Sequence, residues 1–363
     1  MLRARGLGCL IRGVIEPETL KRFIKPHWIA CALRIASVPL FAFSSLAASA
    51  PGEPPPTPSP APVCRQDNPA AAPALETIRT VMASGRFIAY NPTGLQVIDG
   101  QLTRVSPASI REDLKILRPR FDGLITYGAT HGAERIPDVA AELGFKAVIM
   151  GVWDVNEPTA MYNIIKAARR RPEVVMGVSI GNERVFASQV TFEQMTAAIA
   201  RARKQVPQLA YTTSEPFHMF QRPEAVATLA ELDFLLPIVH PVHQPWFRTA
   251  SPHDSAEFVG NVLTELAKVY CGPILVKETG IPTAPAEGGF SATLQADFYR
   301  ALAVRVPPDG MHTFAYFSAF DAPWRVKDVM AAAGHYPEEA FWGLFDEQRR
   351  AKPVVEGIGL LPQ

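Results

Sequence analysis

Short apolar runs alternate along the chain with longer segments in which apolar residues recur at helical spacing. From about residue 84, eight of these runs have the length of buried strands. They cover 87–90, 123–127, 146–152, 174–180, 210–214, 234–240, 273–278 and 313–320. Strict alternation of strand and helix predicts parallel strands with crossovers on the outside of the sheet. Eight such units in about 280 residues predict a (β/α)8 TIM barrel.

A doubly wound open sheet is the alternative α/β fold. That fold would be favoured by a glycine-rich fingerprint after the first strand, but residues 91–94 read Asn-Pro-Thr-Gly. Capping residues place helices between the predicted strands. Ser109 with Glu112 and Thr191 with Gln194 have capping-box spacing, and Ser291 can cap the segment that follows it. The sequence therefore favours the closed barrel.

The N-terminal part of the chain, residues 1–50, has the pattern of a signal peptide. Basic residues are frequent up to about residue 26, an apolar run covers 35–47, and Ala-Ser-Ala follows at 48–50. The run is shorter than the ~20 residues of a transmembrane helix, and an uncleaved N-terminal anchor is the alternative. We expect a secreted or periplasmic protein that contacts a membrane only if the leader is retained.

The remaining chain divides into a linker and one large domain. Residues 51–83 form a Pro-rich linker and lead-in, beginning PGEPPPTPSPAP, and residues 84–363 form the barrel domain. Cys64 and Cys271 are the two cysteines outside the leader. In an oxidising compartment they can form a disulfide, and two unpaired thiols are the alternative that the sequence leaves open.

Two of the predicted strands end in a glutamate. The run 174–180 leads into Gly-Asn-Glu, with Glu183 last, and the run 273–277 leads into Glu278. Catalytic side chains of a barrel lie at the carboxyl ends of its strands. These two carboxylates are 95 residues apart, so only a closed sheet brings them together. A protonated and an ionised carboxyl group flanking a sugar can cleave a glycosidic bond, which makes this pair the candidate catalytic residues.

Other strand ends carry residues suited to binding a sugar. Asn182 can donate to a sugar hydroxyl, His240 can face the cleft, and Glu215 can bind a hydroxyl or orient Glu278. Aromatic rings stack on the apolar faces of sugars, and packing at the barrel rim is the alternative for each ring. The candidate aromatic contacts are Tyr90, Tyr127, Trp153, Phe320 and Trp324, among which Tyr127 and Trp324 are preferred.

Three separated motifs resemble glycoside hydrolase family 17. Ile-Gly-Asn-Glu at 180–183 resembles its acid/base motif, and Lys-Glu-Thr-Gly-Ile-Pro-Thr at 277–283 resembles its nucleophile motif, E-T-G-W-P-S. Residues 317–325 and 341–345 are similar to the end of its bacterial members. The resemblance covers about 84–355 and implies a TIM barrel, a retaining mechanism and β-1,3-glucan substrates, with Glu183 as acid/base and Glu278 as nucleophile. Lys277, Ile281 and Ser318 depart from the family pattern, which has a small, an aromatic and an acidic residue there.

Hydrolysis and transfer to another sugar use the same two glutamates, so a β-1,3-glucanosyltransferase is an alternative to a hydrolase. A glucan-binding module without catalysis is an alternative of another class. The net charge of +1 gives no reason to expect nucleic acid, and we expect a monomer without a cofactor.

Two short patterns point to other chemistries. Gly-Val-Ser-Ile-Gly at 177–181 matches the nucleophile elbow of serine acyl hydrolases, with Ser179 as nucleophile and Asp321 and His335 as partners. His240 and His243 have metal-ligand spacing, but the intervening proline excludes the helix on which catalytic zinc ligands sit, so we expect no metal.

Overall fold

The computed structural model describes residues 61–65, 68–327 and 336–361. The predicted signal peptide or anchor and the linker up to residue 60 lie outside this range, so they stay predictions. Within the described residues, no helix combines the length and apolar character needed to cross a bilayer.

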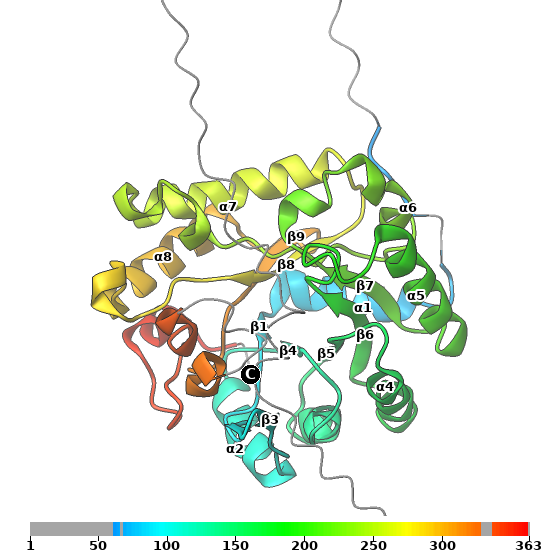
Figure 1. Cartoon of the computed structure of the whole chain (residues 1–363), viewed down its shortest axis with the longest axis horizontal. Helices are drawn as coiled ribbons and strands as arrows, with labels where there is room; N and C mark the ends of the chain where they lie inside the picture. Colours follow the sequence, from blue (N-terminus) through cyan, green and yellow to red (C-terminus); the bar gives the residue numbers. More distant parts are fainter. Residues whose placement is uncertain (1–60, 66–67, 328–335, 362–363) are drawn as a thin grey trace, which may run out of the picture. The chain divides into compact units, whose positions relative to one another are not determined.

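Seven parallel strands form one sheet in the order β7-β6-β5-β4-β1-β9-β8. They are β1 (Phe87–Ala89), β4 (Gly123–Ile125), β5 (Ala147–Val152), β6 (Val175–Asn182), β7 (Ala210–Ser214), β8 (Ile274–Thr279) and β9 (His312–Tyr316). Each coincides with a predicted apolar run. The strands lie together at the centre of the fold, with helices around them (Figure 1).

The eighth predicted strand, 234–240, closes the ring between β7 and β8. Its residue Ile238 forms parallel bridges to Pro216, just after β7, and to Glu278 on β8. The Ile238 N–H donates to Glu215 O at 2.9 Å, and the Val239 N–H donates to Glu278 O at 2.8 Å. The predicted (β/α)8 barrel is therefore confirmed, with one strand held by short bridges rather than by a regular ladder.

Helices follow the strands and cover the outside of the barrel. They are α2 (Pro107–Leu117), α3 (Ile136–Glu142), α4 (Pro158–Arg170), α5 (Phe192–Gln205), α6 (Val226–Leu229), α7 (Pro252–Ala267) and α8 (Ala292–Arg305). Alternate strand residues, such as Ile88, Val148 and Val276, are buried in the same outer core as the apolar faces of these helices. This two-sided burial explains why the strands are apolar along their whole length.

The predicted helix caps are partly correct. Thr191 forms the expected capping box with Gln194 at the start of α5, and Ser291 accepts a hydrogen bond from the Leu294 N–H at the start of α8. The prediction of Ser109 as the cap of α2 is wrong. Ser106 caps that helix, because Pro107 suits the first helical position, where its missing N–H costs nothing.

A helix that the sequence analysis did not identify fills the amino end of the barrel. Helix α1 (Ala72–Ser84) lies in the predicted lead-in and buries Ile78 and Met82 against inward-facing strand residues such as Phe87 and Leu275. A small antiparallel hairpin, β2 (Val97–Ile98) with β3 (Gln101–Leu102), was also not predicted.

Of the two states that the sequence allows for the cysteines, the structure shows the disulfide. Cys64 and Cys271 are joined, with their Cα atoms 5.2 Å apart. Two backbone hydrogen bonds flank the bridge, from the Val63 N–H to Val269 O and from the Cys271 N–H to Val63 O. The segment before α1 is thereby attached to the chain that leads into β8.

The burial of α1 gives a first prediction. Ile78→Ala should lower the free energy of unfolding by about 2–5 kcal/mol, because it opens a cavity in the interior of the barrel. Thr80→Ala, on the exposed side of the same helix, should change it by less than about 0.5 kcal/mol. Urea denaturation of both variants measures the difference, and equal small effects would show that α1 does not belong to the folded core.

Candidate active site

Glu183 follows β6 in a turn whose backbone conformation is rare for residues other than glycine. Gly181 has a φ of 79° and Glu183 a φ of 54°, both in the left-handed region. The turn is held by the Glu183 N–H, which donates to Ser214 O at 2.8 Å. Glu215 also stabilises this turn. Its Oε1 accepts a hydrogen bond from the Val185 N–H at 2.9 Å, and its Oε2 accepts one from the Phe186 N–H at 3.1 Å.

Glu278 lies near the end of β8 with only 6% of its surface exposed. Its Oε2 is 3.4 Å from His240 Nε2, and its Oε1 is 3.5 Å from Lys277 Nζ. Lys277 is also buried. Its ammonium group lies 4.1 Å from the centre of the Tyr127 ring and donates a hydrogen bond to Asn182 Oδ1. Residues from β6 and β8 and from the segment just after β4 thus come together at the carboxyl end of the barrel.

The two glutamates have opposite pKa shifts. Burial, and then the charge of Glu278, raises the pKa of Glu183 to about 7. Burial alone would raise the pKa of Glu278 as well, but the charge of Lys277 and the hydrogen bond with His240 outweigh it and bring this pKa to about 2. At weakly acidic pH, Glu183 is protonated and Glu278 is ionised, which are the states that a glycosidase acid and nucleophile require.

A profile of the BtgE/BtgC glycoside hydrolase domain matches residues 88–343. The chain belongs to this family. The glucan 1,3-beta-glucosidase of Arthroderma benhamiae is 25% identical in an alignment 299 residues long, which covers 77% of this chain and 94% of that protein. The predicted resemblance to glycoside hydrolase family 17 is confirmed at the level of the family.

Two solved structures show the same fold. The family 17 β-1,3-glucanosyltransferase of Rhizomucor miehei shares 21% identity with a TM-score of 0.57, covering 74% of this chain and 96% of that one. The β-galacturonidase of Eisenbergiella tayi bound to galacturonate shares 14% identity with a TM-score of 0.58, covering 76% and 50%.

Three of the predicted aromatic contacts lie on the carboxyl side of the glycoside hydrolase barrel with some exposed surface. Trp153 is 41% exposed, with the Arg184 guanidinium 5.5 Å from its ring centre. Trp324 is half-buried, and Tyr127 is 8% exposed beside Lys277. Trp153 and Tyr127 lie next to each other, with ring centres 6.5 Å apart.

The other two aromatic residues pack inside the rim, which corrects their assignment as sugar contacts. Tyr90 is fully buried, and its hydroxyl donates to the buried Asp113 at 2.8 Å. Phe320 is 4% exposed and packs between Tyr90 and Phe345. Their positions at strand ends were predicted correctly, but both side chains belong to the apolar core that the helices cover.

Glu215 also needs correction as a residue that binds a hydroxyl. Its side chain is fully buried and both oxygens accept the backbone N–H groups after Glu183, so it holds the turn that carries Glu183 rather than the substrate. Its interpretation as a residue that orients Glu278 is likewise replaced, since its partners belong to the Glu183 turn.

Two residues of the site were not chosen from the sequence. Trp342 is 2% exposed, with its ring centre 4.8 Å from that of His240 and 5.3 Å from that of Phe317. Arg325 pairs with Glu339 at 2.7 Å and lies 5.0 Å from the Phe317 ring centre. Both residues fall within the two C-terminal segments that resemble family 17, and this resemblance is the signal that could have identified them.

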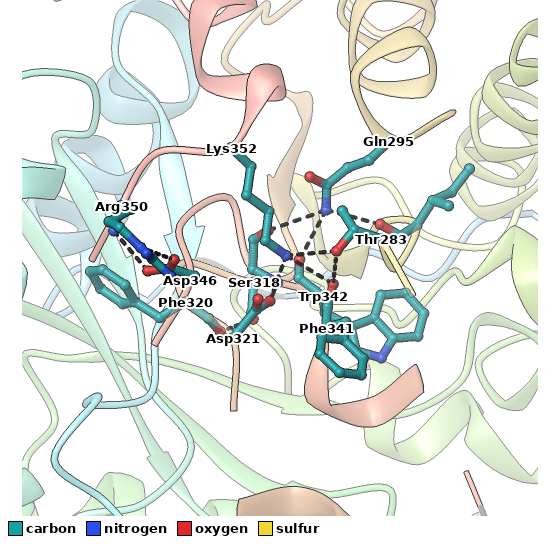
Figure 2. A network of polar contacts seen from close by, with 12 residues as sticks. Thr283, Gln295, Ser318, Phe320, Asp321, Phe341, Trp342, Asp346, Arg350 and Lys352 are labelled. Carbon is teal, nitrogen blue, oxygen red and sulfur yellow. Dashed lines mark hydrogen bonds and ion pairs between the residues drawn. The ribbon is translucent and has the colours of Figure 1, made fainter. Parts of the chain in front are cut away.

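A polar network behind the site fixes the loops that follow β8 and β9. Lys352 Nζ donates to Asp321 Oδ1 at 2.6 Å, to Thr283 Oγ1 at 2.9 Å and to Phe341 O at 3.2 Å (Figure 2). Gln295, fully buried on α8, donates to backbone carbonyls in the same region, including that of Trp342. These contacts hold the loop that carries Trp342 against the barrel.

The alternative chemistries do not fit the described residues. Ser179 lies inside β6, without the strand-to-helix turn that a nucleophile elbow needs, so the acyl hydrolase interpretation is wrong. Its candidate partner Asp321 is bound to Lys352, and His335 lies outside the described residues. Among residues 61–65, 68–327 and 336–361, no group of three or more potential ligands is arranged to hold a metal ion.

The raised pKa of Glu183 predicts a pH-dependent effect on stability. In the unfolded chain a glutamate ionises near pH 4.5, whereas folded Glu183 keeps its proton until about pH 7, so the folded state loses stability as pH rises between these values. Glu183→Gln removes this loss. It should raise the free energy of unfolding by about 1–3 kcal/mol at pH 8 and change it little at pH 4.

Denaturant unfolding at the two pH values measures this effect. Glu193→Gln, at an exposed position on α5, is the matched control and should show no such pH dependence. A destabilised Glu183→Gln variant at pH 8 would contradict the assigned protonation state.

Proposed function

We propose that the protein is an exported retaining glycosidase that acts on β-1,3-glucan. The observation that supports this most strongly is a pair of glutamates at the carboxyl end of the barrel that influence each other electrostatically and have opposite pKa shifts. The named activities of the Arthroderma and Rhizomucor relatives indicate the substrate class. The disulfide between Cys64 and Cys271 fits an oxidising compartment, and with the predicted signal peptide it supports export.

The proposed reaction proceeds by double displacement. The ionised Glu278 attacks the anomeric carbon and forms a covalent glycosyl ester, while Glu183 donates its proton to the oxygen of the leaving sugar. Glu183, now ionised, then takes a proton from water, whose oxygen attacks the anomeric carbon. This second step breaks the ester, releases the sugar and restores both glutamates to their starting states.

The proposed contacts with the sugar come from the residues around this pair. Asn182 Nδ2 and His240 offer hydrogen bonds at the reacting sugar, and Trp342 packs against His240. Tyr127, Trp153 and Trp324 offer apolar ring faces for stacking. The half-exposed Trp153 extends the site away from the two glutamates, which suits a substrate of more than one sugar unit.

Transfer to a second sugar is the other candidate, because an acceptor hydroxyl can replace water in the second step. The fold similarity to a glucanosyltransferase over 96% of that chain keeps this candidate open. Incubation with a linear β-1,3-glucan oligosaccharide separates the two: products longer than the substrate show transfer, and shorter products alone show hydrolysis.

Removal of either glutamate should abolish cleavage of laminarin. Glu278→Gln removes the nucleophile and should lower kcat by about 10³-fold or more. Glu183→Gln removes the acid and should lower kcat about 10²- to 10⁴-fold, with much smaller loss on a dinitrophenyl glycoside, whose leaving group needs no proton.

Reducing-sugar release from laminarin, with Glu193→Gln as control, measures both effects. Full activity in Glu278→Gln would rule out the proposed nucleophile. Glucan binding without cleavage by the unaltered protein would instead support the non-catalytic alternative.

Trp153→Ala should weaken substrate binding more than catalysis. Loss of one stacking surface is expected to raise KM for a β-1,3-glucan oligosaccharide roughly threefold to tenfold, with kcat nearly unchanged. Tyr162→Ala, at an exposed aromatic residue on α4, should leave KM unchanged. Steady-state kinetics on both variants test this, and an unchanged KM in Trp153→Ala would remove this residue from the binding site.

A further inference from the structure

Lys277 is a charged residue at an interior position of the barrel. Along β8, Leu275 is packed in the apolar core inside the barrel and Val276 in the outer core, so alternation also points Lys277 inward. Its side chain is 2% exposed. The family 17 motif that this segment resembles has a small residue here, whereas this chain has a lysine.

The contacts of the ammonium group account for its burial. A buried charge is strongly unfavourable unless it is paired and hydrogen-bonded. The Nζ atom has Glu278 Oε1 at 3.5 Å, the Tyr127 ring centre at 4.1 Å and a hydrogen bond to Asn182 Oδ1. One cation thus contacts the proposed nucleophile and the neighbour of the proposed acid at the same time.

We propose that Lys277 is a positioning residue of the retaining reaction, which keeps Glu278 ionised and turns the amide of Asn182 toward the sugar. This inference rests on the proposed function, because it takes Glu278 as the nucleophile.

The orientation of Asn182 follows from hydrogen-bond chemistry. An ammonium group has only donors, so the atom of Asn182 that faces Lys277 is its carbonyl oxygen. The amide nitrogen then points the other way, with two donors available for a sugar hydroxyl. Hydrogen bonds to the hydroxyl next to the anomeric carbon strengthen in the transition state of such reactions. A small residue at position 277 would leave the direction of this amide unspecified.

Several charged and titratable groups surround Lys277. Glu183 follows β6 and Glu215 follows β7, and burial raises the pKa of both to about 7, so both are mostly neutral at weakly acidic pH and neither competes with Glu278 for the charge of Lys277. Arg325 approaches from the loop after β9 and is paired with Glu339. Tyr127, after β4, is kept neutral because burial and the charge of Glu278 raise its pKa. Glu278 is therefore the anion that Lys277 faces.

On its other side Glu278 faces two histidines. His240 contacts Glu278 Oε2, and burial lowers the pKa of the neighbouring His243 to about 4, so His243 stays neutral above that pH. Lys277 is accordingly the strongest influence that lowers the pKa of Glu278. Its replacement by the uncharged Met, which has a similar length, should let that pKa rise toward the value set by burial.

The first test measures the ionisation of Glu278 through its reactivity. A 2,4-dinitrophenyl 2-deoxy-2-fluoro-β-laminaribioside traps the glycosyl-enzyme, and its leaving group needs no proton from Glu183. The rate of inactivation therefore reports the ionised fraction of the nucleophile. For the unaltered protein the rate should stay constant from pH 7 down to about 3.5, because the pKa of Glu278 is about 2. At low pH the rate falls as the nucleophile becomes protonated, and we call this fall the acidic limb of the profile. For Lys277→Met, the midpoint of the acidic limb should lie at least about one pH unit higher.

Lys352→Met is the matched control. It removes another ammonium group of low exposure, which pairs with Asp321 at 2.6 Å and donates its hydrogen bonds to Asp321, Thr283 and Phe341 rather than to Glu278. The acidic limb of its inactivation profile should lie at the same pH as that of the unaltered protein, whether or not the substitution lowers the stability of the protein. The proposal is overturned if the midpoint of the acidic limb does not change in Lys277→Met, or if it changes by the same amount in Lys352→Met.

The outcomes separate this proposal from the proposed function. If mass spectrometry finds no label on Glu278 of the unaltered protein, the proposed function itself fails. If the label is on Glu278 but the limb does not depend on Lys277, only the role of Lys277 fails. If Lys277→Met does not fold, the profile of the unaltered protein still tests the proposal. An acidic limb with its midpoint at pH 4.5 or above would contradict a nucleophile that is kept ionised by a neighbouring cation.

The second test measures the orientation of Asn182. Aryl β-laminaribiosides with and without the hydroxyl next to the reacting anomeric carbon are compared by kcat/KM. Loss of this hydroxyl should reduce kcat/KM strongly in the unaltered protein and in Lys352→Met, and at least about tenfold less in Lys277→Met. An identical penalty in all three proteins would show that Lys277 does not orient the amide.

Discussion

Closure of the strand ring is the constraint on which the site depends. Glu183 follows β6, the second strand from one end of the seven-stranded sheet, and Glu278 belongs to β8, the strand at the other end. Only the segment 234–240, through Ile238 and its bridges to Pro216 and Glu278, brings β7 and β8 together. The same segment delivers His240 to Glu278. The segment that closes the ring therefore also supplies a contact of Glu278.

The charges inside the closed ring explain how two glutamates acquire different roles. Both are buried, which favours the neutral form of each. Lys277 and His240 lie against Glu278 and reverse this preference for that residue alone. The negative charge that results then adds to the tendency of Glu183 to keep its proton. The positive charge of Lys277 and the contact with His240 thus make the pair asymmetric, and the strained turn held by Glu215 keeps Glu183 in place.

Periodicity predicted the eight strands and the closed barrel well, because strands buried on both faces leave continuous apolar runs. Helix α1 was missed although Ile78 and Met82 have helical spacing, since it lies next to a Pro-rich segment. The ends of the predicted strands also identified Glu183 and Glu278 as the candidate catalytic residues. The direction of a side chain after a strand depends on loop geometry that periodicity does not encode. Tyr90, Phe320 and Glu215 were therefore placed at the correct edge with an incorrect role.

The central claim is that an ionised glutamate and a protonated one act on the same sugar by double displacement. The most direct measurement is the configuration of the first product formed from a β-1,3-glucan oligosaccharide, followed by proton NMR before mutarotation. Two successive displacements at the anomeric carbon predict that the β-anomer appears first. Initial release of the α-anomer would mean a single displacement by water and would contradict the account.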